Sequence, residues 1–484
     1  MKLNNPELLR SQCLINGEWC DALSGKREAV INPATGAELA SIPLVSEEET
    51  QQAIAAAQRA QNEWKQLTAK QRSALLLAWA DKVLAAQEDL AQLMTAEQGK
   101  SLAEARGEVA YAASFITWFA EEAKRVDGAV LQAPQASQRL VVVKQPIGVC
   151  AAITPWNFPA AMITRKVAPA LAAGCAIIVK PAEQTPLTAL ALAKLAQDAG
   201  IPAGVLQVVT GEAAQVGKVL CDSPVVRKLS FTGSTEVGRI LMAQCAPSIK
   251  KLSLELGGNA PVIVFDDANL DAAVAGIMAS KFRNSGQTCV CANRIYVQDG
   301  IYERLAEKLV AAVEQLKVGD GSQEGTTQGP LIDSDAVAKV QSHIDDALIK
   351  GAQIATGGQP HALGGTFFQP TVVTGVTQKM RFAKEETFGP VAPLFRFHDE
   401  AEAIAMANDT EFGLAAYLFT QNAARQWRVP EALEYGMVGI NTGLISNEVA
   451  PFGGVKQSGL GREGSRYGIE EYLELKYLCI DVSR

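Results

Sequence analysis

Short apolar runs alternate with Ala/Leu-rich stretches over residues 140–316, and this alternation constrains the fold more than any other feature. The runs have the length of strands and are rich in β-branched residues, so they are predicted to be buried strands. Buried strands that alternate with helices favour a parallel, doubly wound α/β sheet. The predicted strands are LVVVK (140–144), IGVCAAITP (147–155), AIIVK (176–180), VLQVV (205–209), KLSF (228–231), PVIVF (261–265) and RIYVQ (294–298).

The length of 484 residues exceeds what one core accommodates, so two or three domains are expected. The alternation resumes after Asp266, which favours a second α/β domain. The first 125 residues are predicted to be helical after a short extended entry, with a helix stop at Gly99. Their helix starts are marked by three capping-box spacings, Ser46 with Glu49, Thr68 with Gln71, and Ser101 with Glu104.

The composition excludes several classes of function. The 44 basic and 52 acidic side chains give a net charge of −8 without a basic block, so no nucleic-acid partner is expected. No run of about 18 apolar residues occurs and the start lacks a signal peptide's apolar core, so we expect no membrane association. Nine scattered cysteines favour a reducing, cytoplasmic location. Three separated histidines, without HExxH or CxxC motifs, predict no metal site.

Two residues suggest covalent catalysis. Cys289 follows a predicted helix in the turn-prone stretch FRNSGQTCVCAN, where an exposed thiol with a stabilised thiolate would be reactive. Taken alone, a packed structural cysteine is the simpler interpretation. Glu255 lies at the carboxyl end of the predicted strand KLSLEL, before Gly257 and Gly258. A partly buried carboxylate there would have a raised pKa suited to a general base, although a surface acid closing a strand explains it equally well.

Asn157 lies between two prolines in ITPWNFPAAM. Because Pro155 and Pro159 fix the backbone, the side-chain amide is a candidate donor to a developing oxyanion. A turn asparagine is the simpler alternative.

Two further segments suggest a cofactor. Lys180 and Glu183 lie at the end of a buried strand in IIVKPAEQTP. They could bind the ribose of a cofactor, or they could be solvated residues at a strand end. Gly233 and Ser234 begin a helical segment in FTGSTEVG, and free amides at a helix start can bind pyrophosphate. The spacing differs from the GxGxxG fingerprint, so the motif alone is weak evidence.

Together these segments resemble the aldehyde dehydrogenase superfamily over nearly the whole chain. The motifs that carry the resemblance occur in the family's order and approximate spacing, and they are PWNFP, KPAEQTP, FTGSTEVG, LELGGNAP, GQTC, EETFGP and PFGGVKQSG. The resemblance implies a doubly wound NAD(P)-binding domain (residues 1–126 and 146–257), an α/β catalytic domain (258–457) and a small β oligomerisation unit (127–145 and 470–484). It also implies a homo-oligomer, a tetramer in preference to a dimer.

The resemblance further implies roles for single residues. Cys289 matches the nucleophile that gives a thiohemiacetal, and the Asn157 side chain with the Cys289 backbone amide matches the oxyanion donors. Hydride transfer to the nicotinamide then leaves a thioester, which water activated by Glu255 hydrolyses. Members that transfer the acyl group to coenzyme A lack this glutamate, so hydrolysis is favoured. Positions that contact the cofactor are matched by Trp156, Lys180, Glu183, Gly233, Ser234, Glu386 and Phe388.

Within the superfamily, MITRK, KFRNSGQTCVCAN and ISNEVAPFGG are similar to the bacterial succinate-semialdehyde dehydrogenase group. In that group two arginines and a serine bind the distal carboxylate of the semialdehyde substrate, and they match Arg165, Arg283 and Ser446. A buried carboxylate needs such charge-assisted partners, although both arginines could instead form internal ion pairs. Glutarate semialdehyde is the nearest alternative, because one methylene changes discrimination by only about 1–3 kcal/mol.

The cofactor preference depends on Glu183. The best-known bacterial members of the group carry serine at this position and prefer NADP. A carboxylate accepts hydrogen bonds from ribose hydroxyls but repels a 2′-phosphate, so NAD is expected to be preferred over NADP.

Cys291 lies two residues after the nucleophile, and in some relatives such a pair forms a reversible disulfide. Cys291 is therefore a candidate redox partner of Cys289, with a packed small residue as the alternative.

Two different classes of function remain as alternatives. One is a non-catalytic binding protein with this fold, and the other is a cysteine hydrolase without a cofactor. The first requires a damaged site and the second has no use for the Lys180 region. Because Cys289, Glu255, Asn157 and Lys180 are all present, an NAD(P)-dependent dehydrogenase is favoured.

Overall fold

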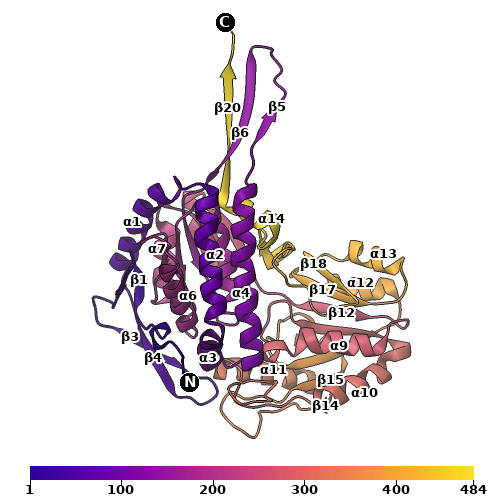
Figure 1. Ribbon diagram of the computed structural model, residues 1–484. Helices are drawn as coiled ribbons and strands as arrows, with labels where there is room; N and C mark the ends of the chain where they lie inside the picture. Colours follow the sequence, from indigo (N-terminus) through magenta and orange to yellow (C-terminus); the bar gives the residue numbers. More distant parts are fainter. Residues whose placement is uncertain (484) are drawn as a thin grey trace.

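The computed structural model describes residues 1–483 and contains two large sheets, each with helices on both faces (Figure 1). A third, three-stranded sheet projects away from them. The α/β architecture predicted from the alternation is confirmed. Within the described residues no helix is long and apolar enough to cross a membrane.

The first sheet has eight strands in the order β19-β11-β10-β7-β8-β9-β1-β2. Its five central strands are parallel, whereas β1 and β19 run antiparallel to their neighbours. The bounds are β1 Cys13–Ile15, β2 Glu18–Cys20, β7 Val149–Ile153, β8 Ile177–Lys180, β9 Leu206–Val208, β10 Val226–Thr232, β11 Lys251–Glu255 and β19 Gly459–Leu460.

Strand β7 and most of β8 are apolar because both faces of the sheet are covered, whereas β9, β10 and β11 also bury the polar residues Gln207, Lys228 and Ser253. Ile177 and Val179 pack with α2, α4, α5 and α6, whereas Ile178 faces α1, α7 and α8. Successive side chains of a strand point to opposite faces, so a strand between two helical layers needs no polar positions.

The helices around the first sheet begin where their caps predict. All three capping boxes are formed, and Gly99 ends α3 with a φ of 95°. The bounds are α1 Glu47–Trp64, α2 Ala69–Ala85, α3 Gln87–Gln98, α4 Leu102–Glu122, α5 Ala161–Ala173, α6 Pro186–Asp198, α7 Ala213–Asp222 and α8 Thr235–Cys245.

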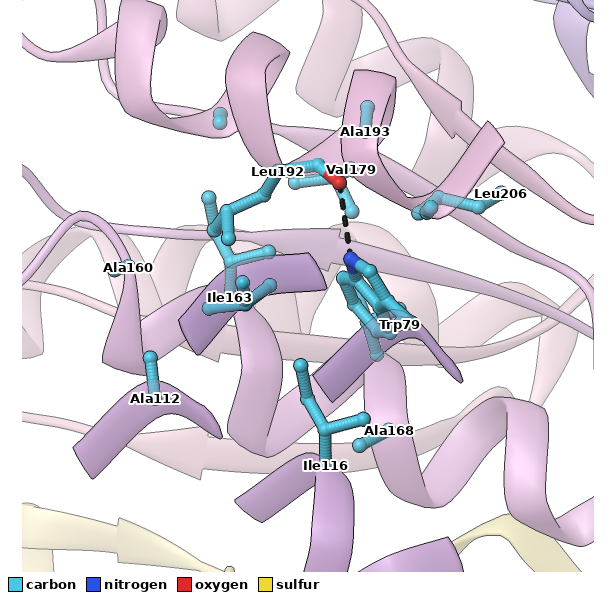
Figure 2. Close-up of a cluster of buried hydrophobic side chains, with 14 of the residues drawn as sticks. Trp79, Ala112, Ile116, Ala160, Ile163, Ala168, Val179, Leu192, Ala193 and Leu206 are labelled. Carbon is cyan, nitrogen blue, oxygen red and sulfur yellow. Dashed lines mark hydrogen bonds between the residues drawn. The ribbon is translucent and has the colours of Figure 1, made fainter. Parts of the chain in front are cut away.

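Trp79 of α2 is at the centre of the larger core of this unit. Figure 2 shows its indole among side chains of α4, α5 and α6, with Ile116 and Ile163 nearby. The indole Nε1 donates a hydrogen bond to the Leu192 carbonyl at 3.1 Å, which satisfies the one polar atom of a fully buried ring.

The second sheet has seven strands in the order β14-β15-β16-β13-β12-β17-β18, and only β14 is antiparallel to its neighbour. Its strands are β12 Ala260–Val264, β13 Ala292–Gln298, β14 Gln353–Thr356, β15 Thr371–Val376, β16 Val391–Phe397, β17 Ala415–Phe419 and β18 Met437–Ile440. Its helices are α9 Leu270–Lys281, α10 Tyr302–Val313, α11 Ser334–Ile349, α12 Glu400–Asn408 and α13 Arg425–Ala432, and α14 Ser465–Gly468 follows later in the chain.

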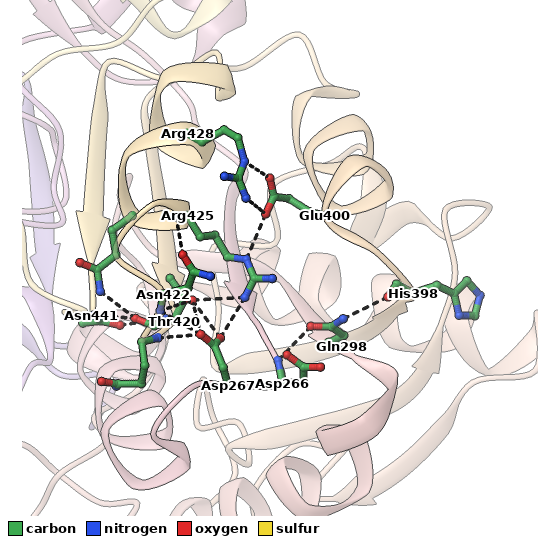
Figure 3. A network of polar contacts seen from close by, with 12 residues as sticks. Asp266, Asp267, Gln298, His398, Glu400, Thr420, Asn422, Arg425, Arg428 and Asn441 are labelled. Carbon is green, nitrogen blue, oxygen red and sulfur yellow. Dashed lines mark hydrogen bonds and ion pairs between the residues drawn. The ribbon is translucent and has the colours of Figure 1, made fainter.

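A polar network ties α12 and α13 to the end of this sheet (Figure 3). Asp267 accepts hydrogen bonds from Thr420 Oγ1 at 2.8 Å and from Arg425 Nη1 at 3.0 Å. Arg425 also pairs with Glu400, which binds Arg428 in turn. The network lies among second-sheet elements and stabilises that unit.

The third sheet corrects one prediction. The run LVVVK (140–144) is not a buried parallel strand, because it lies in β6 Gln138–Pro146, between β5 Ala129–Leu131 and β20 Leu473–Asp481. Both pairings are antiparallel, and the strand is only half-buried. Its continuous apolar pattern, typical of a two-sided buried strand, here belongs to a sheet that projects from the body (Figure 1).

The remaining elements are short. A separate two-stranded hairpin is formed by β3 Arg27–Ile31 and β4 Glu38–Pro43. The 3-10 segments are η1 Pro6–Leu8, η2 Ala123–Arg125, η3 Ala246–Ser248, η4 Arg283–Gly286, η5 Asp299–Ile301, η6 Arg381–Ala383, η7 Lys456–Ser458 and η8 Ile469–Tyr472.

Candidate active site

Four parallel strands of the first sheet end at one edge, and the chain places polar groups immediately after each. In an open α/β sheet this carboxyl edge is where ligands bind. The strands and the predicted residues that follow or end them are β7 with Trp156 and Asn157, β8 with Lys180, β10 with Gly233 and Ser234, and β11 with Glu255.

The part of the chain that forms the second sheet contributes the Cys289 thiol. Cys289 lies on the turn between η4 and β13, as predicted, and faces Gly258 in the connection from β11 of the first sheet to β12 of the second. A Cβ added at Gly258 would lie 2.7 Å from the Cys289 carbonyl oxygen, so only glycine permits this approach. One cavity of about 290 Å³ is lined by the predicted residues Trp156, Asn157, Gly233, Ser234, Glu255, Cys289, Glu386 and Phe388.

The Cys289 thiol is largely enclosed, and burial raises its pKa to about 12. The positive charge of Arg165 opposes this effect, as Arg283 does more weakly, whereas the carboxylates of Glu386 and Glu255 reinforce it. The thiol is therefore neutral at pH 7 and needs a proton acceptor, or a change in its surroundings, to become a nucleophile.

Glu255 is buried at the end of β11, and neither of its carboxylate oxygens has a hydrogen-bond partner within residues 1–483. Burial raises its pKa well above the usual range, and the nearby Glu463 raises it further. Lys166 and Arg165 act in the opposite direction. A buried carboxylate without partners and with a raised pKa has the properties of a general base.

Asn157 is buried and held at two points. Its side-chain Nδ2 donates to the Gln287 carbonyl at 3.0 Å, and its own carbonyl accepts from Lys100 Nζ at 2.7 Å and Asn284 Nδ2 at 3.0 Å. Pro155 and Pro159 were expected to hold Asn157 in place. In the structure these three hydrogen bonds restrain it directly. Nδ2 carries a second hydrogen, which remains for a ligand in the cavity.

The same cavity fits a nicotinamide nucleotide. Ser234 is the N-cap of α8 and lines the cavity, so the start of that helix lies at the cavity's edge. Glu386 accepts a hydrogen bond from the Gly258 amide at 3.2 Å, and burial raises its pKa to about 7. Trp156 and Phe388 meet edge to face at 5.6 Å and form an aromatic wall.

Lys180 and Glu183 form an ion pair beside this region, with Lys180 buried. Glu183 also lines a larger cavity of about 540 Å³, shared with Glu28 of β3. The pKa of Glu28 is raised by burial and then by the negative charge of Glu183. Two carboxylates therefore flank the lysine that is predicted to contact the adenine ribose.

The predicted substrate-binding residues are separated into two environments. Arg283 and Ser446 line a cavity of about 230 Å³ together with Tyr111 and Phe158. The guanidinium carbon of Arg283 lies 4.9 Å from the centre of the Phe158 ring, and no ion pair of this arginine occurs within residues 1–483. Arg283 is therefore available to an anion.

Arg165 has partners of its own. It is fully buried, donates to Tyr111 Oη at 2.6 Å and lies 3.5 Å from a carboxylate oxygen of Glu463. The internal ion pair that the sequence left open as an alternative is thus present for Arg165. Its Nε has no hydrogen-bond partner in the described chain.

Cys291 is fully buried and does not line the nucleophile's cavity, and its Sγ donates to the Lys281 carbonyl at 3.3 Å. Both Cys289 and Cys291 are free thiols. In the described residues, no three His, Cys, Asp or Glu side chains converge as a metal ion would require.

Sequence reasoning missed Lys100, Tyr111 and Asn284, which contact the predicted site residues. Tyr111 lies within an apolar-periodic helix and gives no signal beyond that of a core residue. Asn284 has a φ of 51° in η4, which favours asparagine over most residues, but backbone angles are not visible in a sequence. Lys100 directly follows Gly99, and only its burial distinguishes it from a surface lysine.

The fold and the cavity define a class of α/β protein in which a thiol, a buried carboxylate and a helix start meet at one sheet edge. The chain belongs to the aldehyde dehydrogenase family, whose family model matches residues 19–478. The expected fold is confirmed by solved structures. The crystal structure of a succinate-semialdehyde dehydrogenase from Burkholderia pseudomallei matches this chain with a TM-score of 0.99 and 64% identity, and the match covers 100% of both chains.

Two relatives illustrate activities that occur near this sequence. A succinate-semialdehyde dehydrogenase of Escherichia coli K12, whose name specifies NADP(+), is 65% identical, with 99% of this chain and 100% of that protein covered. A glutarate-semialdehyde dehydrogenase of Pseudomonas putida KT2440 is 64% identical, with 100% of both chains covered. Use of NAD(P) and an aldehyde substrate follow from the family.

Proposed function

We propose that this chain oxidises succinate semialdehyde to succinate with NAD(P)+, by way of a thioester on Cys289. The observation that carries the proposal is the convergence of Cys289, Asn157 and Glu255 on one cavity, beside a second cavity that holds Arg283 and Ser446. The E. coli relative supports the same substrate.

The chemistry needs two successive steps. The Cys289 thiol gives its proton to water, and the resulting thiolate attacks the aldehyde carbon. The carbonyl oxygen becomes an oxyanion that the Asn157 amide and the Cys289 backbone amide stabilise. A nicotinamide cofactor held by Ser234, Glu386 and Phe388 would supply the hydride acceptor, and loss of hydride from that carbon would leave a thioester. Glu255 then takes a proton from water as the water attacks the thioester, and Cys289 departs as the thiolate.

The position of Arg283 and Ser446 favours a substrate with a distal carboxylate. An exposed face of a guanidinium in a cavity beside the nucleophile offers paired, charge-assisted hydrogen bonds to such a group. Arg165 also supplies positive charge, although Glu463 already pairs with it.

Glutarate semialdehyde is the second candidate substrate, because the P. putida relative that acts on it is nearly as similar as the E. coli relative. The two substrates differ by one methylene, which is worth about 1–3 kcal/mol in a fitted pocket.

The cofactor preference proposed here is NAD over NADP. Glu183 pairs with Lys180, and Glu28 lines the same cavity as Glu183, so two carboxylates would face a 2′-phosphate. Like charges at such separations repel appreciably in a partly desolvated site. The E. coli relative is named for NADP(+), so the test is the ratio of kcat/KM for NAD+ and NADP+ with this chain.

The third sheet is proposed to join subunits, with the tetramer favoured over the dimer. The sheet projects from the body and exposes large apolar side chains on β20, among them Leu475, Tyr477 and Ile480. Exposed apolar patches of this kind are typical of interfaces. The domain boundaries given above are retained in this proposal, with residues 127–145 and 470–484 as the oligomerisation unit.

The test is kcat/KM for succinate semialdehyde, glutarate semialdehyde, butanal and benzaldehyde, each with NAD+ and NADP+. The acidic aldehydes should be strongly preferred to butanal. Equal activity on butanal would leave the family chemistry intact and contradict the carboxylate site.

A further inference from the structure

A buried ion pair lies directly behind Asn157, in the wall of the cavity that holds Arg283 and Ser446, and the chemistry above assigns it no role. Lys100 Nζ is 2.5 Å from Glu108 Oε2, and both side chains are essentially inaccessible to solvent, at 0% and 1% exposure. Burying two charges costs desolvation energy, and apolar residues of similar volume commonly stabilise a fold as well or better. General stability is therefore a weak explanation for this pair.

The ion pair holds both sides of the Asn157 turn. Lys100 Nζ donates to the Asn157 carbonyl at 2.7 Å. The second oxygen of Glu108 accepts from the backbone amides of Ala160 and Ala161, at 2.9 and 3.2 Å, where α5 begins. The segment 157–161 is thus anchored at each end by one member of the pair.

The second unit completes the support. Asn284 Nδ2 donates to the same Asn157 carbonyl at 3.0 Å and also to the Gln287 carbonyl at 3.3 Å. The Gln287 carbonyl accepts the Asn157 side chain, and Gln287 lies two residues before the nucleophile. The backbone and the side chain of Asn157 are therefore tied to the thiol's own loop.

We propose that Lys100, oriented by Glu108 and assisted by Asn284, is a positioning residue that aims the Asn157 amide at the oxyanion next to Cys289. The inference rests on the proposed role of Asn157. It predicts that Lys100 affects the rate of the chemical step only through the Asn157 side chain.

A double-mutant cycle tests this dependence, with single-turnover hydride transfer from succinate semialdehyde to NAD+ as the readout. Lys100→Met should slow hydride transfer about 10- to 100-fold, the effect of misplacing a catalytic group by an ångström, with KM nearly unchanged. In an Asn157→Ala background the same substitution should cause no further loss, because the group that it positions is gone.

The matched control is Lys228→Met. Lys228 is another fully buried lysine, bound to Ser253 Oγ at 2.5 Å and 3.7 Å from Glu471, without a contact to Asn157. It should lower the melting temperature and leave the rate of hydride transfer unchanged. If Lys100→Met does not fold, Asn284→Gly serves in its place, because glycine tolerates the φ of 51° and removes both donated hydrogen bonds.

Three outcomes contradict the idea. They are an unchanged rate in Lys100→Met, the same fractional loss in the Asn157→Ala background as in the wild type, and an equal loss in Lys228→Met. An Asn157→Ala variant as fast as the wild type would instead refute the proposed role of Asn157, and so distinguishes failure of the proposed function from failure of this inference.

Discussion

The guanidinium of Arg165 lies 3.5 Å from the carboxylate of Glu463, yet it remains the positive charge that most lowers the pKa of the Cys289 thiol. The buried Arg165 therefore interacts electrostatically with both Glu463 and Cys289. Its effect on the thiol is independent of any substrate, so it can be measured without an aldehyde.

Replacing Arg165 by methionine should shift the pH dependence of Cys289 alkylation by iodoacetamide to higher pH. The thiolate is the reactive form, and its fraction grows as the pH rises towards the pKa of about 12. Loss of a nearby positive charge disfavours the thiolate and raises that pKa further. Rates of alkylation between pH 6 and 10, followed by mass spectrometry at Cys289, measure the shift.

Arg283→Met is the comparison for this experiment, because Arg283 lowers the pKa of Cys289 less than Arg165 does. It should shift the profile in the same direction by a smaller amount. An Arg165→Met profile that coincides with the wild type would contradict the electrostatic role.

Arg283→Met should also reduce kcat/KM for succinate semialdehyde about 10- to 100-fold, the value of losing hydrogen bonds to a charged group. Butanal has no carboxylate, so its kcat/KM should fall only by the smaller factor that the raised pKa of the Cys289 thiol causes. Ser446→Ala should give a smaller loss with the same substrate dependence. Equal losses on both aldehydes would indicate structural damage and contradict the carboxylate site.

Glu183→Ser should raise kcat/KM for NADP+ about tenfold, equivalent to about 1.4 kcal/mol of relieved charge repulsion. Glu28→Ala should act in the same direction, because Glu28 lines the same cavity. KM for NAD+ should increase in Glu183→Ser, since a ribose hydrogen-bond acceptor is lost. An unchanged NADP+ to NAD+ ratio in both variants would show that neither carboxylate sets the preference.

The sequence predicts the five central strands of the first sheet and strands β12 and β13 of the second because both faces of these strands are covered, whereas β1 to β4 and β14 to β18 were not predicted. AIIVK and PVIVF contain no polar position inside the strand, and a parallel sheet between helical layers is the structure that needs such a pattern. The same pattern misled at LVVVK, whose apolar faces belong to a projecting sheet. Composition alone does not distinguish burial within a domain from an exposed apolar surface.

The site was predictable only as separate motifs. Cys289, Glu255 and Asn157 each have an ordinary structural explanation, and Cys289 follows Asn157 by 289 − 157 = 132 positions, so their convergence depends on tertiary structure. Lys100 and Glu108 lacked any signal, because a lysine and a glutamate on or beside a helix are usually solvated. Burial identified them, and sequence patterns do not report burial of a charge.

Oxidation by peroxide should join Cys289 and Cys291 in a disulfide that dithiothreitol reverses. The peroxide oxygens leave as two waters, and each thiol gives up one hydrogen. Cys291 must first release its hydrogen bond to the Lys281 carbonyl, so the reaction should be slow. Peptide mapping of the inactivated protein measures the cross-link. The Cys291→Ser variant should instead be inactivated irreversibly, whereas reversible inactivation of that variant would contradict the pairing.

Glu255→Gln should separate the two halves of the reaction. Glutamine keeps the shape of the side chain but accepts no proton, so thioester formation should proceed while hydrolysis slows by about 10²- to 10⁴-fold. Rapid mixing should then show a burst of about one NADH per Cys289, followed by slow turnover.

The pH dependence of hydrolysis follows from the same carboxylate. Because the pKa of Glu255 is raised, its basic form is lost as the pH falls through that raised value, and steady-state turnover of the wild type should fall with it. The acidic limb should be absent in Glu255→Gln, which has no group to titrate there. Glu97→Gln is the control, since Glu97 is also buried with a pKa raised to about 7 but binds the start of α6. If Glu255→Gln gave no burst, or kept the acidic limb, another group would have to activate the water.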